Sequence, residues 1–216
     1  MRRSSPGGES TRSAILEAAE RLFAEKGFDR GRLEDVAEAV GIRRASIVYY
    51  FRDKRELYDA VLDGVFSDFR GRLDDTLSAP GPFRERVDAA IVEWVDYVGK
   101  RPTFARIILR EVADTGTDAP PAAMPHILPF MPIVQRFLER QAADADLQTV
   151  RIAPVHLASA IAGATVFFVA AIPSLVPDVG FDPVSPDHLE THRAEVLKIA
   201  HHLMGLSDEA ATTEDT

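Results

Sequence analysis

Apolar residues recur at intervals of three and four along most of this chain, with prolines and glycines between the repeating stretches. This spacing lines one face of an α-helix, whereas a half-buried strand alternates apolar and polar residues. The pattern therefore predicts an all-α protein. We expect helices over residues 10–26, 33–40, 44–51, 53–77, 83–99, 102–112 and 132–143, from residue 154 onward, and over 188–204.

Residues at the ends of these stretches favour a helix start or stop. Asp53 followed by Glu56 resembles a capping box, in which the two side chains accept hydrogen bonds from free N–H groups of the first turn. Ser185 before a proline predicts the start of the last helix. Glycine can close a helix in the left-handed conformation, so we expect helix ends at or near Gly27, Gly41 and Gly99.

Composition excludes several classes of protein. The chain has 216 residues, of which 46% are hydrophobic, so one or two domains can bury a sizeable core. It contains no cysteine, which excludes disulfides, thiolate zinc sites and a thiol nucleophile. No apolar stretch follows the basic residues 1–8, so we expect no signal peptide and a cytoplasmic protein.

Charge is unevenly distributed along the chain. Residues 1–60 carry 12 Lys and Arg against 11 Asp and Glu, whereas the remaining residues carry 13 against 23. A chain of net charge −9 can bind nucleic acid when its cations gather on one face. On charge alone, a solvated surface is the simpler interpretation. The candidate cluster consists of Arg43, Arg44, Arg52, Lys54 and Arg55.

Residues 157–175 carry no charge and are long enough to cross a membrane. We expect a buried helix instead, because His156, Ser159 and Thr165 interrupt the apolar character and Pro173 lies inside its end. Small residues such as Gly163 allow close backbone approach on several sides. The segment therefore predicts a helix between its own core and a second copy of the chain, that is, a homodimer.

The stretch from Leu33 to Tyr50 has the spacing of a helix-turn-helix. Ala37 is small enough for two helices to cross closely, and Gly41 can take the positive φ that the turn requires. Ile47 is placed to pack back against the first of the two helices. An ordinary helical hairpin would show the same pattern if this stretch stood alone.

A wider set of residues carries a resemblance to one known family: Ile15–Ala19, Leu22–Phe28, Val36–Ile42 and Tyr49–Leu57. The chain is similar to the tetracycline-repressor (TetR) family over about Thr11–Val61, and more weakly in the helical organisation of the remainder. This implies a three-helix helix-turn-helix DNA-binding domain over 10–56 and a helical effector-binding and dimerisation domain over 57–206. We expect disordered tails over 1–9 and, because it is acidic and polar, over 207–216.

The resemblance implies a homodimer that binds an inverted-repeat operator in double-stranded DNA. Its third helix would enter the major groove, where Arg43 or Arg44 can bind a base edge or a phosphate. The chain departs from the family by lacking a hydroxyl residue at Arg43, a glycine at Ala45 and a tyrosine at Val48, so its sequence preference is expected to differ. The candidate DNA-binding residues are Arg32, Arg43, Arg44, Ser46, Tyr49, Tyr50 and Lys54.

The resemblance also implies that the middle helices bind a small effector that changes the spacing of the two DNA-reading heads. Because the candidate lining residues are mostly large and apolar, we expect a mainly hydrophobic effector, with Arg110, His126 and Gln135 as polar neighbours. The candidate ligand-binding residues are Trp94, Val98, Phe104, Ile107, Ile108, Glu111, Phe130, Met131, Val134, Phe137, Ile161, Thr165 and Phe168.

Other chemistry is weakly supported by the sequence. His188, His192 and Glu195 have a metal-ligand spacing, but surface positions or a dimer seam explain them better. No arrangement typical of catalysis is present, and we expect no cofactor, no metal and no enzymatic activity. Two alternatives remain open: a helical carrier or interaction protein that has lost DNA binding, and a helical enzyme that uses Glu111 or His126.

Overall fold

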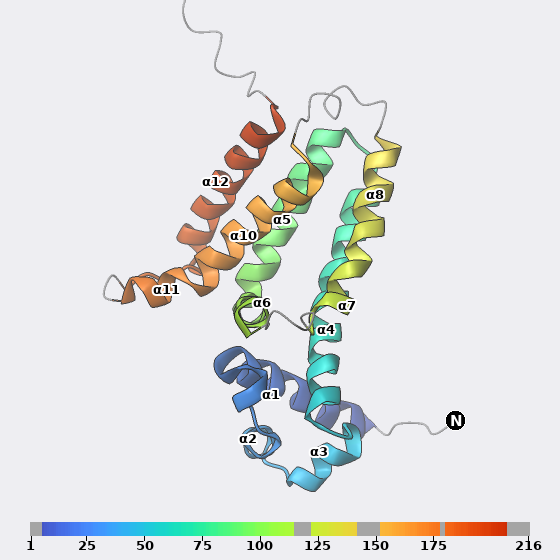
Figure 1. Cartoon of the computed structure of the whole chain (residues 1–216), viewed down its shortest axis with the longest axis vertical. Helices are drawn as coiled ribbons and strands as arrows, with labels where there is room; N and C mark the ends of the chain where they lie inside the picture. The colour runs from blue at the N-terminus through green and yellow to red at the C-terminus, as the bar shows by residue number, and fades with distance from the viewer. Residues whose placement is uncertain (1–5, 115–121, 142–151, 178–179, 207–216) are drawn as a thin grey trace, which may run out of the picture. The chain divides into compact units, whose positions relative to one another are not determined.

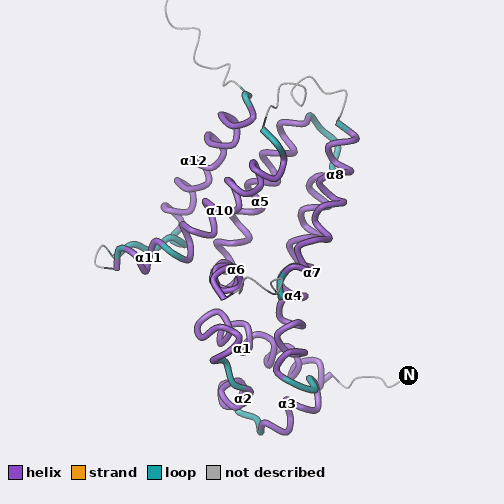
Figure 2. Tube along the Cα trace, viewed as in Figure 1, coloured by secondary structure: helices purple, strands orange, loops and turns teal. Residues whose placement is uncertain are grey.

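The structure, a computed structural model, describes residues 6–114, 122–141, 152–177 and 180–206. Within these ranges the chain forms helices joined by loops and no strand, which confirms the all-α prediction (Figures 1 and 2). The helices are α1 (Pro6–Arg30), α2 (Leu33–Val40), α3 (Arg44–Tyr50), α4 (Lys54–Ser78), α5 (Phe83–Lys100), α6 (Pro102–Asp114), α7 (Met124–Ile127), the 3₁₀ turn η1 (Leu128–Phe130), α8 (Met131–Arg140), α10 (Pro154–Ala170), α11 (Ile172–Leu175) and α12 (Pro186–Met204).

The chain forms two compact units. The first unit is formed from residues 1–68 and 106–127, and the second from residues 69–105 and 128–216. Two long helices, α4 and α6, therefore contribute residues to both units. The boundary predicted at residues 56 and 57 lies inside the first unit. Because α1 begins at Pro6, residues 6–9 are helical and not part of a tail, while residues 1–5 and the predicted tail 207–216 lie outside the described residues.

The first unit has a core of apolar side chains from α1 to α4. Ile15, Val36, Ile47 and Leu57 are fully buried, and the buried Phe23 ring meets the Tyr58 ring edge to face at 4.9 Å. Burying each such side chain stabilises the fold by about 1.5–3 kcal/mol. The core therefore holds the short α3, which has only seven residues, against its neighbours.

Two glycines adopt positive φ in the first unit. Gly41 has φ 72° and ψ 31°, and the Ile42 N–H beyond it donates to the Ala37 carbonyl at 2.9 Å, so the predicted end of the second helix is confirmed. Gly27 has φ 76° and ψ 172°, which is not a left-handed helical conformation. Two helical segments of α1 meet at Gly27, so the predicted stop of the first segment is confirmed, whereas the predicted left-handed cap is wrong.

The second unit packs α5, α10 and α12 side by side (Figure 1). Gly99 is the last residue but one of α5, so the predicted helix end near it is confirmed. A Cβ at Gly99 would come within 2.4 Å of the Leu189 side chain on α12. Its lack of a side chain therefore serves close helix packing. Phe83 on α5 stacks on Phe137 of α8 at 5.5 Å, and Val196 on α12 is buried in the same core.

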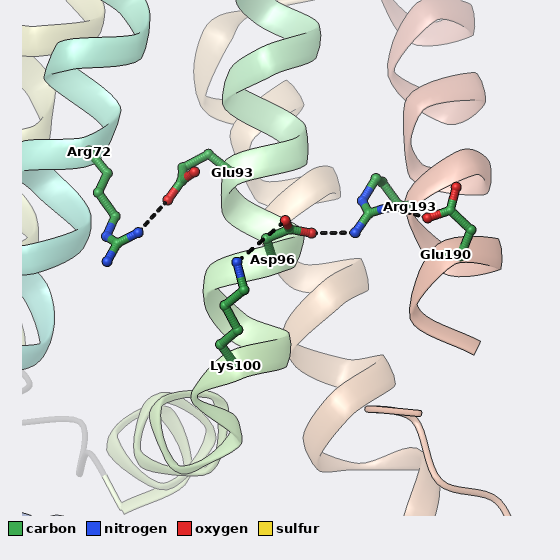
Figure 3. A network of polar contacts seen from close by, with 6 residues as sticks. All are labelled: Arg72, Glu93, Asp96, Lys100, Glu190 and Arg193. Carbon is green, nitrogen blue, oxygen red and sulfur yellow. Dashed lines mark hydrogen bonds and ion pairs between the residues drawn. The ribbon is translucent and has the colours of Figure 1, made fainter. Parts of the chain in front are cut away.

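Ion pairs connect the helices of the second unit, as Figure 3 shows. Arg193 on α12 bonds to Asp96 on α5 and to Glu190 one turn before it. Lys100 lies 3.7 Å from the other Asp96 oxygen. The Asp96 carboxylate raises the pKa of Arg193 above its ordinary value. Because these pairs are only partly buried, they contribute more to helix alignment than to stability.

Two predicted caps can be compared with the structure. The Glu56 N–H donates to Asp53 Oδ1 at 2.8 Å, which confirms the Asp53 cap and lowers the pKa of that carboxyl. The Glu56 carboxylate accepts from the Arg52 N–H, one residue earlier than in a standard capping box. Ser185 occupies the predicted N-cap of α12, but its hydroxyl donates to the Asp182 carbonyl and caps no helical N–H.

The uncharged segment 157–175 does not form one continuous helix. α10 ends at Ala170, and the short α11 follows it. Among the described residues, no helix is long and apolar enough to cross a membrane. The helix predicted over 132–143 begins one residue earlier and is preceded by α7 and η1, while its last predicted residues, 142 and 143, lie outside the described ranges.

Candidate DNA-binding surface and effector region

The helix α3 turns one side toward the core and the other toward solvent. Ile47 anchors it from the inner side and is fully buried. At 100° per residue, the exposed residues follow one another around the helix in the order Arg44, Val48, Ala45 and Tyr49, an arc of about 140°. The outer side of α3 thus presents a cation, two small apolar side chains and a phenol together.

The start of α3 carries two arginines in different settings. Arg43 is the N-cap and, as expected from the missing hydroxyl, makes no side-chain cap bond. Arg44 Nε lies 2.9 Å from a Glu34 carboxylate oxygen in the first turn of α2, and Arg32 Nε lies 3.7 Å from the other oxygen. The Glu34 carboxylate therefore pairs with two of the predicted DNA-binding arginines, a role that no residue pattern reveals.

The end of α3 carries two tyrosines. Tyr49 is 77% exposed, and its ring meets the half-buried Tyr50 ring edge to face at 5.1 Å. A phenol that stands out from the surface can donate to a phosphate oxygen. Ser46, between these residues and the N-cap, is half-buried.

Lys54, predicted to contact phosphate, binds the protein in this structure. Its Nζ donates to the Phe28 carbonyl at 2.8 Å and to the Asp29 carbonyl at 3.1 Å, and it lies 4.4 Å from the centre of the Phe28 ring. An ammonium group has three N–H donors, so one remains for a phosphate oxygen. Lys54 therefore joins the first turn of α4 to the last residues of α1, and its phosphate contact stays a prediction.

The neighbouring cations are exposed but paired. Arg52 Nε lies 3.3 Å from Asp53, and Arg55 Nε lies 2.9 Å from Asp59. Such surface pairs contribute about 0–1 kcal/mol each and exchange readily for other partners. Three cations of the predicted cluster, Arg44, Arg52 and Arg55, thus form exposed ion pairs, from which their guanidinium groups can move to an incoming phosphate.

Comparison with known proteins identifies the first unit. Residues 15–61 match the family model described as bacterial regulatory proteins, tetR family. Over this stretch the chain is similar to regulators of the TetR family. It is 42% identical over 65 residues to the HTH-type transcriptional regulator TtgR of Pseudomonas putida, covering 30% of this chain and 31% of TtgR.

A longer match relates the chain to the HTH-type transcriptional repressor NicS of Pseudomonas putida. The two are 31% identical over 114 residues, covering 51% of this chain and 52% of NicS. The chain thus spans about a third to a half of the curated relatives it matches. The regulator FadR of Bacillus subtilis, whose crystal structure is a complex with stearoyl-CoA, superposes with a TM-score of 0.61 over 90% of this chain and 98% of FadR, at 15% identity. This shows a shared fold.

The predicted effector residues in the second unit include part of an aromatic cluster. Trp94 on α5 meets Phe104 of α6 edge to face at 5.7 Å and Phe69 of α4 at 5.0 Å. The Phe130 ring stacks on the Phe69 ring with centroids 5.7 Å apart. The ring of Tyr97, which is not among the predicted effector residues, lies 5.4 Å from the Phe104 ring. The indole Nε1 of Trp94 is buried without a hydrogen-bond partner among the described residues. The cluster thus combines apolar surface with one unused donor.

The remaining predicted effector residues do not all lie together. Val98 is fully buried on α5, Phe137 packs on Phe83, Val134 is half-buried and Met131 is exposed. On α10, Thr165 is buried and donates to the Ile161 carbonyl at 3.2 Å, and Phe168 stacks on His192 at 4.0 Å.

Three predicted effector residues belong to the first unit: Ile107, Ile108 and Glu111. Glu111 accepts from the Tyr58 hydroxyl and from the Ala123 N–H at 2.9 Å. Its neighbour Arg110 donates from Nε to the Ala24 carbonyl at 2.9 Å and from a second nitrogen to the Glu25 carbonyl. These side chains therefore tie α6 to α1 and α4, a role that residue spacing does not show.

The histidines of α12 contact protein groups. His188 Nδ1 lies 2.8 Å from the Asp182 carbonyl, and His192 Nε2 lies 3.3 Å from the Thr165 hydroxyl. Burial lowers the pKa of His192 below its ordinary value. Within the described ranges, no three His, Cys, Asp or Glu residues gather closely enough to hold a metal ion.

Proposed function

We propose that this chain is a ligand-responsive transcriptional repressor that binds an inverted-repeat operator as a homodimer. One observation carries the proposal: α3 turns Arg44 and Tyr49 outward while Ile47 anchors it, inside the stretch that matches the TetR-family model. An arginine on the exposed face of such a helix reaches guanine in the major groove, and the tyrosine reaches the backbone. The similarity to NicS, a repressor, supports the direction of regulation.

A dimer is supported by an uncovered stripe on α10. His156, Ser159, Gly163 and Phe167 are exposed at helical spacing, and a Cβ at Gly163 would meet no described atom within 4 Å. Phe167 is 48% exposed. A stripe of small residues beside an exposed ring is suited to close packing against a second copy of the same helix.

The effector is proposed to be small and mainly hydrophobic. The aromatic cluster around Trp94 supplies apolar surface, and the free indole N–H suits a carbonyl oxygen on the ligand. The acyl part of an acyl-CoA thioester has an apolar chain and a carbonyl oxygen that fit these two features, while its charged CoA part would have to lie outside the cluster; FadR, which shares the fold, has a crystal structure in complex with stearoyl-CoA. Acyl-CoA thioesters are therefore the first compounds to screen. Trp94 is the only tryptophan in the chain, so its fluorescence reports binding at this cluster directly.

Effector binding releases the operator by changing the separation of the two reading heads. Half-sites one helical turn apart require a fixed distance between the two copies of α3. A ligand that binds more tightly to a dimer with another separation of the α3 helices favours that dimer. It weakens DNA binding by the difference between its affinities for the two conformations. We assign no catalytic step to the chain, and we propose a cytoplasmic location because a repressor acts where its operator lies.

The test is selection of bound duplexes from a random library at two salt concentrations. We expect an enriched inverted repeat, an affinity that falls steeply with salt, and a changed base preference in Arg44→Ala. Absence of binding at both salt concentrations would overturn the proposal and favour a carrier or interaction protein. Binding without any enriched repeat would mean that the chain coats DNA and does not recognise an operator.

A further inference from the structure

The exposed side of α3 has an apolar residue at its centre. Val48 is 43% exposed and lies between Arg44 and Ala45 in the order around the helix. Valine in an exposed helix position is unfavourable for folding relative to most residues, because its branched Cβ is restricted by the preceding turn. Neither helix stability nor the core of the unit therefore explains Val48 at this position.

The neighbours of Val48 define what it can contact. Ala45 and Arg44 lie three and four residues before it, so their side chains adjoin it on the helix surface. The two side chains Val48 and Ala45 present only methyl groups and offer no hydrogen bond to a base. The helical restriction leaves Val48 one preferred rotamer, so its methyl groups have a defined position. This surface fits an apolar partner of fixed shape beside the base that Arg44 reads.

Resting on the proposed function, we propose that Val48, with Ala45 beside it, determines specificity for thymine by packing against the C5-methyl group in the major groove. Thymine is the one DNA base that presents a methyl group in this groove. Val48 lies about 6 Å along the helix axis from Arg44, and bases on one strand are spaced about 3.4 Å apart. The operator half-site therefore carries a thymine within two base pairs of the position whose identity depends on Arg44.

The experiment removes the methyl group from the DNA and from the protein in turn. In the selected operator, the thymine adjoining the Arg44-dependent position is replaced by deoxyuridine, which keeps base pairing and loses only the C5-methyl. Burial of one methyl group corresponds to about a fourfold change in affinity. We expect the wild-type chain to lose about fourfold for one substituted half-site and about fifteenfold for both.

The protein half of the experiment uses Val48→Ala, with Val112→Ala as the matched control because Val112 is also exposed but lies on α6. We expect Val48→Ala to bind the thymine and deoxyuridine operators within about twofold of each other, and Val112→Ala to discriminate as the wild type does. Circular dichroism of each variant confirms that it is folded.

Three results would overturn the inference. The first is a selected half-site without a thymine within two base pairs of the position whose identity depends on Arg44. The second is an unchanged affinity of the wild type for the deoxyuridine operator. The third is a Val48→Ala protein that still prefers the thymine operator fourfold. In all three cases the enriched inverted repeat remains, so the proposed function stands while the role of Val48 fails. A library without an enriched repeat would overturn both.

Discussion

Replacing Lys54 with methionine tests how one side chain serves both the fold and DNA binding. The change keeps the apolar stem and removes the ammonium that binds the Phe28 and Asp29 carbonyls. Water can replace the exposed hydrogen bond to the Asp29 carbonyl. The loss of folding stability therefore arises mainly from the partly buried hydrogen bond to the Phe28 carbonyl and from the contact with the Phe28 ring. Together these give about 1.5 kcal/mol. For a chain of this size, that lowers Tm by about 3–6 °C.

The same variant is measured for DNA binding at several salt concentrations. If the third N–H of Lys54 contacts a phosphate in each half-site, the slope of log affinity against log salt becomes shallower by about 1.8. Lys198→Met is the control, since Lys198 lies on α12 and forms an exposed ion pair with Glu195, and its Tm should stay within about 2 °C of the wild type. A Lys54→Met protein with unchanged Tm would refute the structural role of this lysine.

The remaining predictions concern charge, assembly, pH and coupling. Glu34→Gln should raise affinity for all DNA sequences by roughly three- to tenfold at low salt, because a carboxylate near the phosphates is lost; an unchanged affinity in a filter-binding assay would contradict this. Gly163→Arg should give a folded monomer by light scattering, since charge is costly to bury in a helix seam. Burial lowers the pKa of His192 below 6.5, so as the pH falls the histidine is protonated in the unfolded chain before it is protonated in the folded chain. The stability of the wild type to urea should therefore decrease below pH 6.5, and that of His192→Asn should decrease less. Arg110→Ala should keep operator affinity but weaken release by effector, as seen in titrations that combine operator and ligand.

The helix-turn-helix could be predicted from the sequence because the contacts that define it are local. Ala37, Gly41 and Ile47 lie within eleven residues, and each has a steric requirement that its residue type reveals. The packing role of Gly99, in contrast, depends on a residue far away in the sequence. A glycine after an apolar stretch predicts a helix end, but the close approach of Leu189, ninety residues away, is not contained in any local pattern.

The candidate effector residues show the same limit. Large apolar residues at helical spacing predict the lining of an effector site, and Trp94, Phe104 and Phe137 are buried in the structure. Their contact with an effector stays a prediction. Spacing alone could not separate those in the second unit from Ile107 and Ile108 in the first, because one helix, α6, supplies both. Nor could it show that the Glu111 carboxylate is already occupied by Tyr58 and by a backbone N–H.

The division of α6 itself indicates where coupling should be sought. Phe104, near its start, belongs to the second unit and packs against Trp94, whereas Arg110 belongs to the first and holds the Ala24 and Glu25 carbonyls. These carbonyls lie just before the break at Gly27, where α1 already departs from helical geometry. A helix is stiff over two turns, so a shift at Phe104 would reach Arg110 with little loss. Arg110 donates hydrogen bonds to α1 close to the break at Gly27, which is why we expect its removal to separate effector binding from operator release.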